Sequence, residues 1–155
     1  MIISMKEQYK LIPEVFLLLE NDGKVLLSRR FHTGYEDGNY GLVAGHAEYG
    51  EPMRVALARE VKEEAGIDID PDDLEHMVTI HRWCPDKDNP HARVGFYFTT
   101  KKWKGEIVNM EPEKCDDLSW FPKNAIPPNT IDYIKDAISC LDSHKTYIEF
   151  GWPKK

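Results

Sequence analysis

Cysteine and long apolar segments are scarce in this sequence. The three cysteines, Cys84, Cys115 and Cys140, are odd in number and far apart, which argues against a disulfide framework and indicates reduced thiols in a cytoplasmic protein. The longest apolar run, residues 15–19, is far too short to cross a bilayer. The first residues lack the basic and apolar regions of a secretory signal. We therefore expect neither a membrane span nor secretion.

Positive charge is also in deficit. The chain has 20 Lys and Arg against 27 Asp and Glu, a net charge of −7. Such a balance disfavours non-specific binding to nucleic acid or to an anionic membrane. The aromatic residues are not interleaved with a basic patch either. We expect a small-molecule partner, no nucleic acid polymer and no membrane. With 155 residues, of which 41% are hydrophobic, the chain is predicted to form one globular domain, 1–155.

The apolar pattern predicts several strands and two helices. Strands are expected at 14–20, 24–29, 40–44, 76–82, 93–102 and 118–121. The turn at 21–23 would join the first two strands as a hairpin. Helices are expected from Pro52, as a first-turn residue, to Ala65, with Gly66 just past the end, and over 131–141. This order predicts an α/β fold, a mixed sheet with helices on both faces.

Three glutamates gather on one face of the first expected helix. At about 100° per residue, Glu60, Glu63 and Glu64 fall within an arc of about 100°. The buried stripe expected on the opposite face consists of Val55, Ala58, Val61 and Ala65. A solvated acidic face is the usual explanation. However, Glu60 and Glu64 are like charges four residues apart, which destabilises a helix. A hard divalent cation such as Mg²⁺ or Mn²⁺ would explain the crowding, so both explanations stay open, with the metal site favoured.

A longer pattern covers residues 45–67. Its fixed positions are Gly45, Glu51, Arg59-Glu60-Val61, Glu63-Glu64 and Gly66-Ile67. This spacing resembles the signature of the Nudix hydrolase family, G-x5-E-x7-R-E-U-x-E-E-x-G-U with U aliphatic, at every fixed position. The strands before and after this box, and the last helix, also follow the order of that family. The resemblance therefore covers most of the chain and leaves the tail 144–155 outside.

The resemblance implies a fold, a cofactor and a set of ligands. The fold would be an α/β/α sandwich with a mixed sheet between helices. The activity would be hydrolysis of a nucleoside diphosphate linked to a second group, with Mg²⁺ or Mn²⁺. Glu60, Glu63 and Glu64 would be the metal ligands, with the backbone carbonyl of Ala44 or Gly45 nearby. Metal ions would reverse the repulsion between these carboxylates and an anionic diphosphate.

The same resemblance assigns catalytic roles. Arg59 would orient Glu51 and the helix glutamates through charge-assisted hydrogen bonds. A glutamate would accept the proton of the attacking water. The candidates are Glu60 or Glu63 on the helix and a carboxylate of the segment 111–113, where Glu113 is preferred to Glu111.

Three residues outside the box are candidates for substrate binding. Arg29 resembles an arginine that contacts substrate phosphates, with a surface charge at the strand end as the alternative. Arg30 is a weaker candidate because adjacent strand residues face opposite ways. Tyr35 lies in the loop before the box strand, where it could stack on a base. Asn129 follows two prolines, like an asparagine that reads the nucleobase in relatives that cleave nucleoside triphosphates, and equally fits an N-cap of the second helix.

These patterns predict a MutT-like nucleotide pyrophosphohydrolase. The expected substrate is a nucleoside triphosphate, including a damaged one, cleaved to the monophosphate and pyrophosphate. The alternatives are an ADP-ribose type of nucleotide sugar and a regulator that binds nucleotides without catalysis, which the retained glutamates disfavour. Zinc binding by His81, Cys84 and His91 is disfavoured because their spacing fits no known zinc module. The apolar tail, 147–152, is expected either to form a homodimer contact or to pack back on its own sheet.

Overall fold

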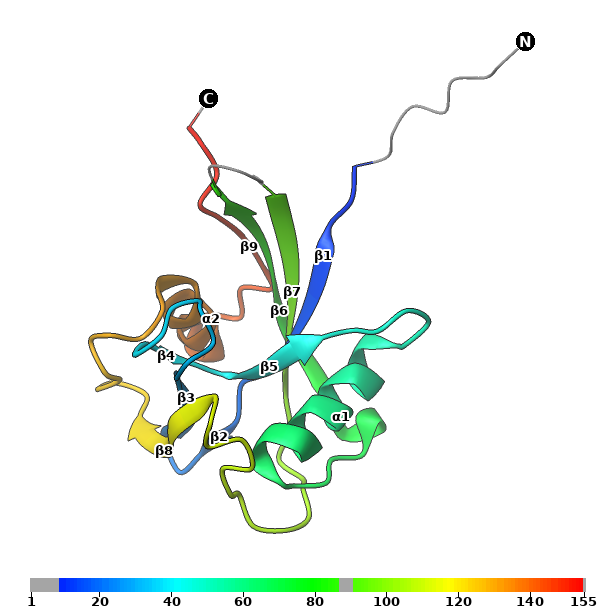
Figure 1. The fold of residues 1–155 in the computed structure, drawn as a ribbon, viewed down its shortest axis with the longest axis vertical. Coiled ribbons are helices and arrows are strands. Elements are labelled where there is room, and N and C mark those ends of the chain that lie inside the picture. Colours follow the sequence, from blue (N-terminus) through cyan, green and yellow to red (C-terminus); the bar gives the residue numbers. More distant parts are fainter. Residues whose placement is uncertain (1–8, 87–90, 155) are drawn as a thin grey trace.

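The computed structural model describes residues 9–86 and 91–154. Within them the chain forms nine strands, two α-helices and one turn of 3-10 helix, shown in Figure 1. The strands are β1 (Ile12–Leu17), β2 (Glu20–Asn21), β3 (Lys24–Arg30), β4 (Tyr40–Gly41), β5 (Val43–His46), β6 (Glu75–Cys84), β7 (His91–Thr99), β8 (Cys115–Pro122) and β9 (Tyr147–Phe150). The helices are α1 (Met53–Ala65), η1 (Pro71–Asp73) and α2 (Asp132–Ser143). None of the helices in these residues is long and apolar enough to cross a membrane.

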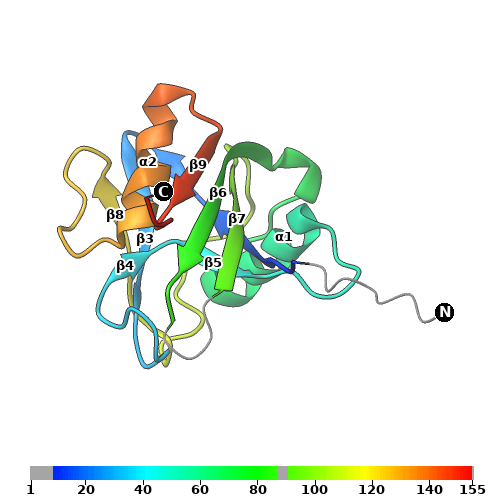
Figure 2. The ribbon, with the colours of Figure 1, turned by 90° about the horizontal axis from the view of Figure 1, so that it is seen from above.

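A five-stranded mixed sheet forms the centre of the fold. Its strand order is β5-β1-β7-β6-β9, with β1 parallel to β7 and β6 parallel to β9, whereas the other pairs are antiparallel. Seen from above in Figure 2, α1 and α2 lie on opposite sides of these strands. The predicted α/β sandwich with a mixed sheet between helices is therefore confirmed.

The alternation of side chains along β1 explains the two layers. Val15 and Leu17 belong to a buried cluster with Leu57 of α1. Phe16 points to the other face, where it joins a second cluster with Ile134 of α2. Because successive side chains of a strand face opposite ways, one strand supplies both cores.

The predicted hairpin is wrong in its strand partners. Only the two residues of β2 pair with β3, while β1 lies in the five-stranded sheet. β3 instead pairs with β4 and along its whole length with β8, which forms a second, four-stranded sheet. Leu18 and Leu19, between β1 and β2, are buried in different clusters. A continuous apolar run carries no period, so the sequence could not show where the chain passes between sheets.

The box helix ends where expected but is rotated relative to the prediction. Gly66 is its C-cap at a φ of 74°, and the Gly66 N–H donates to the carbonyl of Lys62. Pro52 is the N-cap, one position before the predicted first turn. The buried residues of α1 are Ala56, Leu57, Val61 and Ala65. Val55 is 43% exposed and Ala58 is half-buried, because the helix packs through Leu57, which offers more apolar surface than Ala58.

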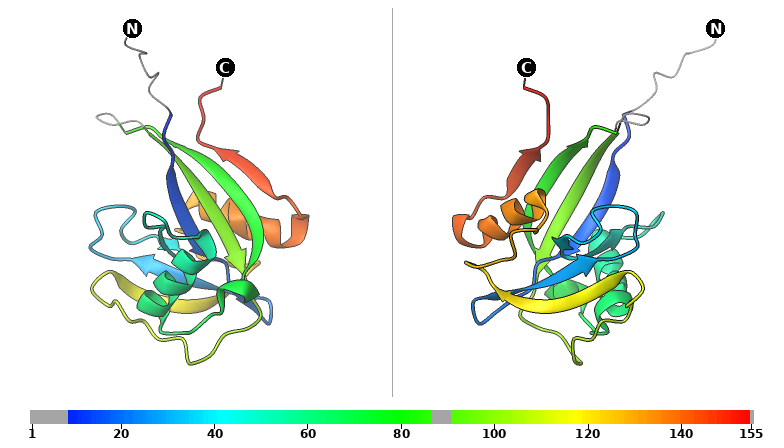
Figure 3. Two further views of the ribbon diagram at one scale, coloured as in Figure 1. Left: turned by 90° about the vertical axis from the view of Figure 1, so that its right-hand side faces the viewer. Right: turned by 60° about the vertical axis from the view of Figure 1, so that its left-hand side comes forward.

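The C-terminal tail packs on its own sheet, which was one of the two expectations. β9 pairs with β6 and places Ile148 in the core; Figure 3 shows the two strands side by side. The indole of Trp152 then contacts the rings of His81 and Trp83. The tail is therefore part of the same fold as the residues that precede it in the sequence.

Candidate active site

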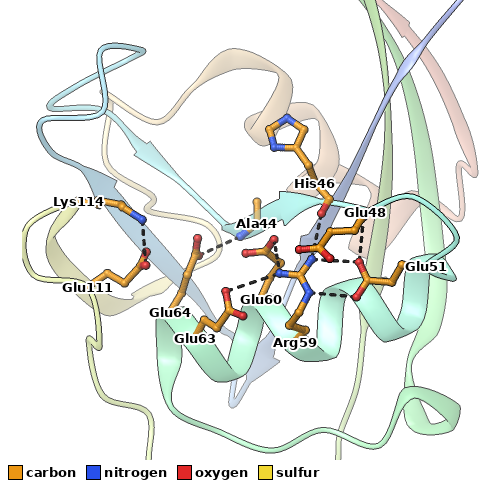
Figure 4. A network of polar contacts seen from close by, with 10 residues as sticks. All are labelled: Ala44, His46, Glu48, Glu51, Arg59, Glu60, Glu63, Glu64, Glu111 and Lys114. Atoms are coloured by element: carbon orange, nitrogen blue, oxygen red, sulfur yellow. Dashed lines mark hydrogen bonds and ion pairs between the residues drawn. The ribbon is translucent and has the colours of Figure 1, made fainter.

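Glycine at position 45 allows α1 to approach β5 closely. Glu60 and Glu64 lie one turn apart on the helix and face the strand, as Figure 4 shows. A Cβ on Gly45 would overlap the Glu60 carboxyl group. The backbone N–H of Ala44 donates to Oε2 of Glu64 at 3.2 Å. Thus the two backbone positions and two of the three glutamates that the sequence singled out meet at one place.

Arg59 holds several acceptors around one guanidinium. Its Nε and Nη2 donate to the two carboxylate oxygens of Glu51, at 3.0 and 3.1 Å. Its Nη1 donates to Glu60 Oε1 at 2.9 Å and lies 3.6 Å from Glu63 Oε2. The carbonyl of His46 accepts a further bond at 3.1 Å from Nη2. This bidentate geometry lowers the pKa of Glu51 and fixes the directions of the neighbouring carboxylates.

Glu64 is the buried member of the acidic group. Burial raises the pKa of its carboxyl to about 7, against the lowering effect of the Ala44 N–H. The charges of Glu60 and Glu111 raise it further, and Lys114 lowers it. A partly buried carboxyl among like charges is the environment in which a cation is strongly stabilising.

The donor set fits a hard divalent cation by its chemistry. Carboxylate oxygens and backbone carbonyls are the ligands that Mg²⁺ prefers. Among residues 9–86 and 91–154, however, no three His, Cys, Asp or Glu side chains already converge as a metal site. Arg59 accounts for this, because it draws Glu60 and Glu63 toward its own guanidinium.

A pocket of about 1060 Å³ opens beside the acidic group. Its lining includes Ala44, Gly45, Glu64 and Glu111. It also includes residues of β1, β6, β7, the loop at 31–39 and the segment before α2. A volume of this size is at the upper end of the range for small-molecule sites.

Of the two loop glutamates, the structure places Glu111, and not the predicted Glu113, in the pocket lining. Glu111 lines the pocket and pairs with Lys114 at 3.0 Å, whereas Glu113 is exposed and lies outside the lining. The turn at 112–114, stabilised by the bond from the N–H of Lys114 to the carbonyl of Glu111, directs the two carboxylates differently. The residue type was foreseen here but not the side that each glutamate faces.

The two arginines at the end of β3 also differ from the prediction in which of them lines the pocket. Arg29, the preferred candidate, is exposed and forms a bidentate pair with Asp116, at 2.7 and 3.1 Å, outside the pocket lining. Arg30 lines the pocket instead. Its guanidinium donates to the carbonyl of Tyr35 at 2.6 Å and to Thr33 Oγ1 at 3.0 Å, so it holds the adjacent loop. The two side chains face opposite ways, as alternation along a strand requires, and Arg30 is the one that faces the pocket.

Tyr35 and Asn129 both line the pocket, as their predicted roles require. The Tyr35 hydroxyl accepts a bond from Arg82 Nη1 at 3.1 Å. Asn129 Nδ2 donates to the carbonyl of Gly38 at 2.8 Å, so it ties the loop to the segment before α2. The N-cap of α2 is Ile131, and the alternative that Asn129 caps this helix is therefore wrong.

The sequence interpretation missed three charged residues in the pocket. Glu14 and Arg82 are almost fully buried, and Arg93 is half-buried beside them. A signal was present, since each interrupts an apolar strand pattern with a charge on the inward-facing period. Each would have been recognised only if the sheet pairing had been known.

Comparison with known proteins agrees with this geometry. Residues 10–140 match the family model described as NUDIX domain. The NAD-capped RNA hydrolase NudC of Pseudomonas entomophila is 34% identical over 128 residues, which cover 81% of this chain and 41% of that protein. NudC of Vibrio atlanticus is 40% identical over 141 residues, covering 83% and 48%. The chain thus spans less than half the length of these curated relatives.

Solved structures show the same fold. A MutT NUDIX hydrolase from Burkholderia pseudomallei superposes with a TM-score of 0.76 at 23% identity, covering 85% of this chain and 98% of that one. The sandwich and the arginine-centred carboxylates on a loop–helix–loop define a Nudix-type domain. With the matching family model, they show that the chain belongs to the Nudix hydrolase family.

Proposed function

We propose that this protein hydrolyses the diphosphate bond of a nucleoside diphosphate linked to a second group, with Mg²⁺ as cofactor. The observation that carries the proposal is a group of carboxylates beside a nucleotide-sized pocket: Glu64 lines the pocket, and Glu60, one helical turn away, is held by Arg59. Membership of the Nudix family supports the same reaction. The earlier alternative of a regulator without catalysis is disfavoured because every charged residue of the box is retained and placed together.

Glu60, Glu63 and Glu64 would hold the metal, with the carbonyl of Ala44 or Gly45. When bound, Mg²⁺ neutralises phosphate charge and lowers the pKa of an attacking water. Arg59 would then keep Glu51 as its bidentate partner and leave Glu60 to turn toward the cation. Gly45 leaves the space in which that carboxylate moves.

A glutamate must accept the proton from the attacking water. Glu111 is our preferred loop candidate in place of Glu113, because it lines the pocket near Glu64. Lys114, at 3.0 Å, would fix its orientation. Glu60 and Glu63 remain the helix candidates for the same role.

The second group of the substrate has two candidates. A nucleoside triphosphate, cleaved to the monophosphate and pyrophosphate, is the one that the sequence favours. A dinucleotide is favoured by the pocket volume of about 1060 Å³ and by the name of the NudC relatives, NAD-capped RNA hydrolases. Because of that name, RNA carrying an NAD cap belongs among the substrates to be tested. The net charge of −7, however, argues against binding to a nucleic acid polymer.

The test is a substrate panel with Mg²⁺. Nucleoside triphosphates, including an oxidised purine, are compared with NAD, ADP-ribose and NAD-capped RNA, and products are separated by chromatography. We expect metal-dependent release of a nucleoside monophosphate from at least one class, abolished by a chelator. Absence of turnover on every class, with the protein folded, would contradict the proposal and favour the binding-only alternative.

A further inference from the structure

A buried charge cluster lines the same pocket as Glu64 and lies beside His46 of β5. It consists of Glu14 on β1, Arg82 on β6 and Arg93 on β7. We call Arg82 and Arg93 the pocket arginine pair. Arg82 and Arg93 are register partners between β6 and β7, and β1 runs beside β7. Glu14 is 7% exposed and Arg82 is 6% exposed. The sheet itself therefore brings these three side chains together.

The two guanidinium groups share a single carboxylate. Glu14 Oε2 accepts from Arg82 Nη2 at 2.7 Å, and Glu14 Oε1 accepts from Arg93 Nη1 at 2.6 Å. Both oxygens are thus engaged by different arginines. Two positive charges and one negative charge leave the cluster with one excess positive charge.

In the part of the chain that the structure describes, the other partners of these arginines are aromatic side chains, and none of them is a carboxylate. The Arg82 guanidinium lies 3.9 Å from the ring centre of Tyr133 and donates to the Tyr35 hydroxyl at 3.1 Å. The Arg93 Nε donates to the ring of His91 at 3.0 Å, and its Nη1 lies 3.3 Å from Nε2 of His46. These contacts orient the guanidinium groups without cancelling the excess charge.

Such a cluster is poorly explained by stability alone. A buried ion group generally contributes no more than apolar residues of the same volume, because its desolvation is costly. An excess charge adds to that cost unless an anion neutralises it. The planar fork of arginine is suited to phosphate and carboxylate, which accept two parallel bonds. The cluster also lines the pocket, so a ligand can reach it.

We propose that the pocket arginine pair binds an anionic group of the substrate other than its diphosphate, a phosphate monoester or a carboxylate. This inference rests on the proposed function for the diphosphate part of the ligand. It narrows the second group to one that carries its own negative charge. A neutral or cationic group at that place binds more weakly.

The experiment compares ligands that differ by one anionic group. UDP-glucuronate and UDP-glucose differ by a carboxylate, and coenzyme A and dephospho-coenzyme A differ by a phosphate. Affinities are measured by calorimetry on the full chain with Ca²⁺ in place of Mg²⁺, and each ligand is checked to be intact afterwards. We expect the anionic member of at least one pair to bind roughly tenfold more tightly, the gain of one charge-assisted hydrogen bond. The pair that responds identifies phosphate or carboxylate as the group.

Charge variants test the cluster in both directions. Arg93→Gln removes the excess charge and is expected to bring the affinity ratio close to one. Glu14→Gln adds to the excess and is expected to raise the ratio. Arg54→Gln is the matched control, because this exposed arginine on α1 lies outside the pocket lining and loses the same charge. Circular dichroism verifies that each variant is folded. If only one of Arg93→Gln and Glu14→Gln folds, that variant alone is enough to test the cluster.

Two results would overturn the inference: equal affinities within both pairs for the wild-type protein, or a ratio that neither cluster variant changes. Failure of the proposed function looks different. If no substrate is hydrolysed but the anionic ligands still bind more tightly, the result supports anion binding by the pocket arginine pair and contradicts the proposed hydrolysis.

Discussion

At the scale of single residues, Arg59 links carboxylates that would otherwise repel one another. Glu63 is the most exposed of the three predicted metal ligands and contacts Arg59 only at 3.6 Å. Its substitution therefore disturbs the fold little. We expect Glu63→Gln to keep the melting temperature within a few degrees and to reduce turnover by orders of magnitude, because a hard-metal ligand is lost. Near-normal kcat at saturating Mg²⁺ would remove Glu63 from the metal site.

Glu111 and Glu113 form a natural matched pair. The two carboxylates are two residues apart, yet only Glu111 lines the pocket. We expect Glu111→Gln to lower kcat by roughly 100-fold or more, the usual contribution of a general base, and Glu113→Gln to have little effect. Rates are measured at saturating substrate and Mg²⁺. The reverse order would restore the sequence-based choice of Glu113.

Glu64 makes the metal-free protein sensitive to pH. Its pKa is raised from 4.5 to about 7 in the folded state, so the folded protein keeps a proton that the unfolded chain releases. The free energy of unfolding should therefore fall as the pH rises from about 4.5 to 7 and stay level above, a loss on the order of 3 kcal/mol. Urea unfolding with a chelator at pH 5 and pH 8 checks this. Glu64→Gln should lack this component, and the same pH dependence in both proteins would exclude Glu64 as its source.

The differences between the predicted residues and the pocket lining share one cause. The box singled out Glu60, Glu63 and Glu64 because its spacing is long and specific. Arg29 was preferred to Arg30 because nothing in the sequence sets the phase of β3 relative to the pocket. A shift of one residue in a strand moves every side chain to the other face. Such choices depend on tertiary pairing, which local patterns do not contain.

At the scale of elements, the helices were more predictable than the sheets. α1 and α2 have clear ends and apolar periods, so their bounds differ from the predictions by only one or two residues. The second sheet was missed, since its short strand β4 and the pairing of β3 with β8 join distant segments. β9 was foreseen only as an apolar tail. Non-local pairing decided each of these outcomes.

The loop at 31–39 is held by contacts from outside itself. Asn129 binds the carbonyl of Gly38 and lines the pocket, so it is placed to tether the loop and to read a base. We expect Asn129→Ala to lower stability by about 1 kcal/mol, the net value of one hydrogen bond. We also expect it to change the kcat/KM ratio for dGTP and dATP by roughly tenfold. Asn124→Ala, at an exposed position, is the control. A lower stability with an unchanged ratio would leave only the tether.

At the scale of the whole molecule, the surface around β9 bears on assembly. β9 is the last strand of the five-stranded sheet, and Tyr147 on it is 50% exposed. Strands at the edge of a sheet present backbone groups that a second copy can pair with. Because Ile148 of β9 is buried in the core and Phe150 packs against it, deleting the tail would test stability rather than assembly. A point change at an exposed position is the sharper experiment.

We expect a homodimer in sedimentation equilibrium of the full chain, with β9 at its interface. Tyr147→Ser should then weaken dimerisation by roughly tenfold or more, since a half-exposed aromatic side chain at an interface contributes on the order of 1–2 kcal/mol. Val108→Ser is the matched control, because Val108 is 51% exposed and lies in the segment between β7 and β8. Equal unfolding curves for both variants would show that the fold is intact. A monomer for the wild-type chain at all concentrations would refute dimerisation, and a dimer that Tyr147→Ser leaves unchanged would place the interface away from β9.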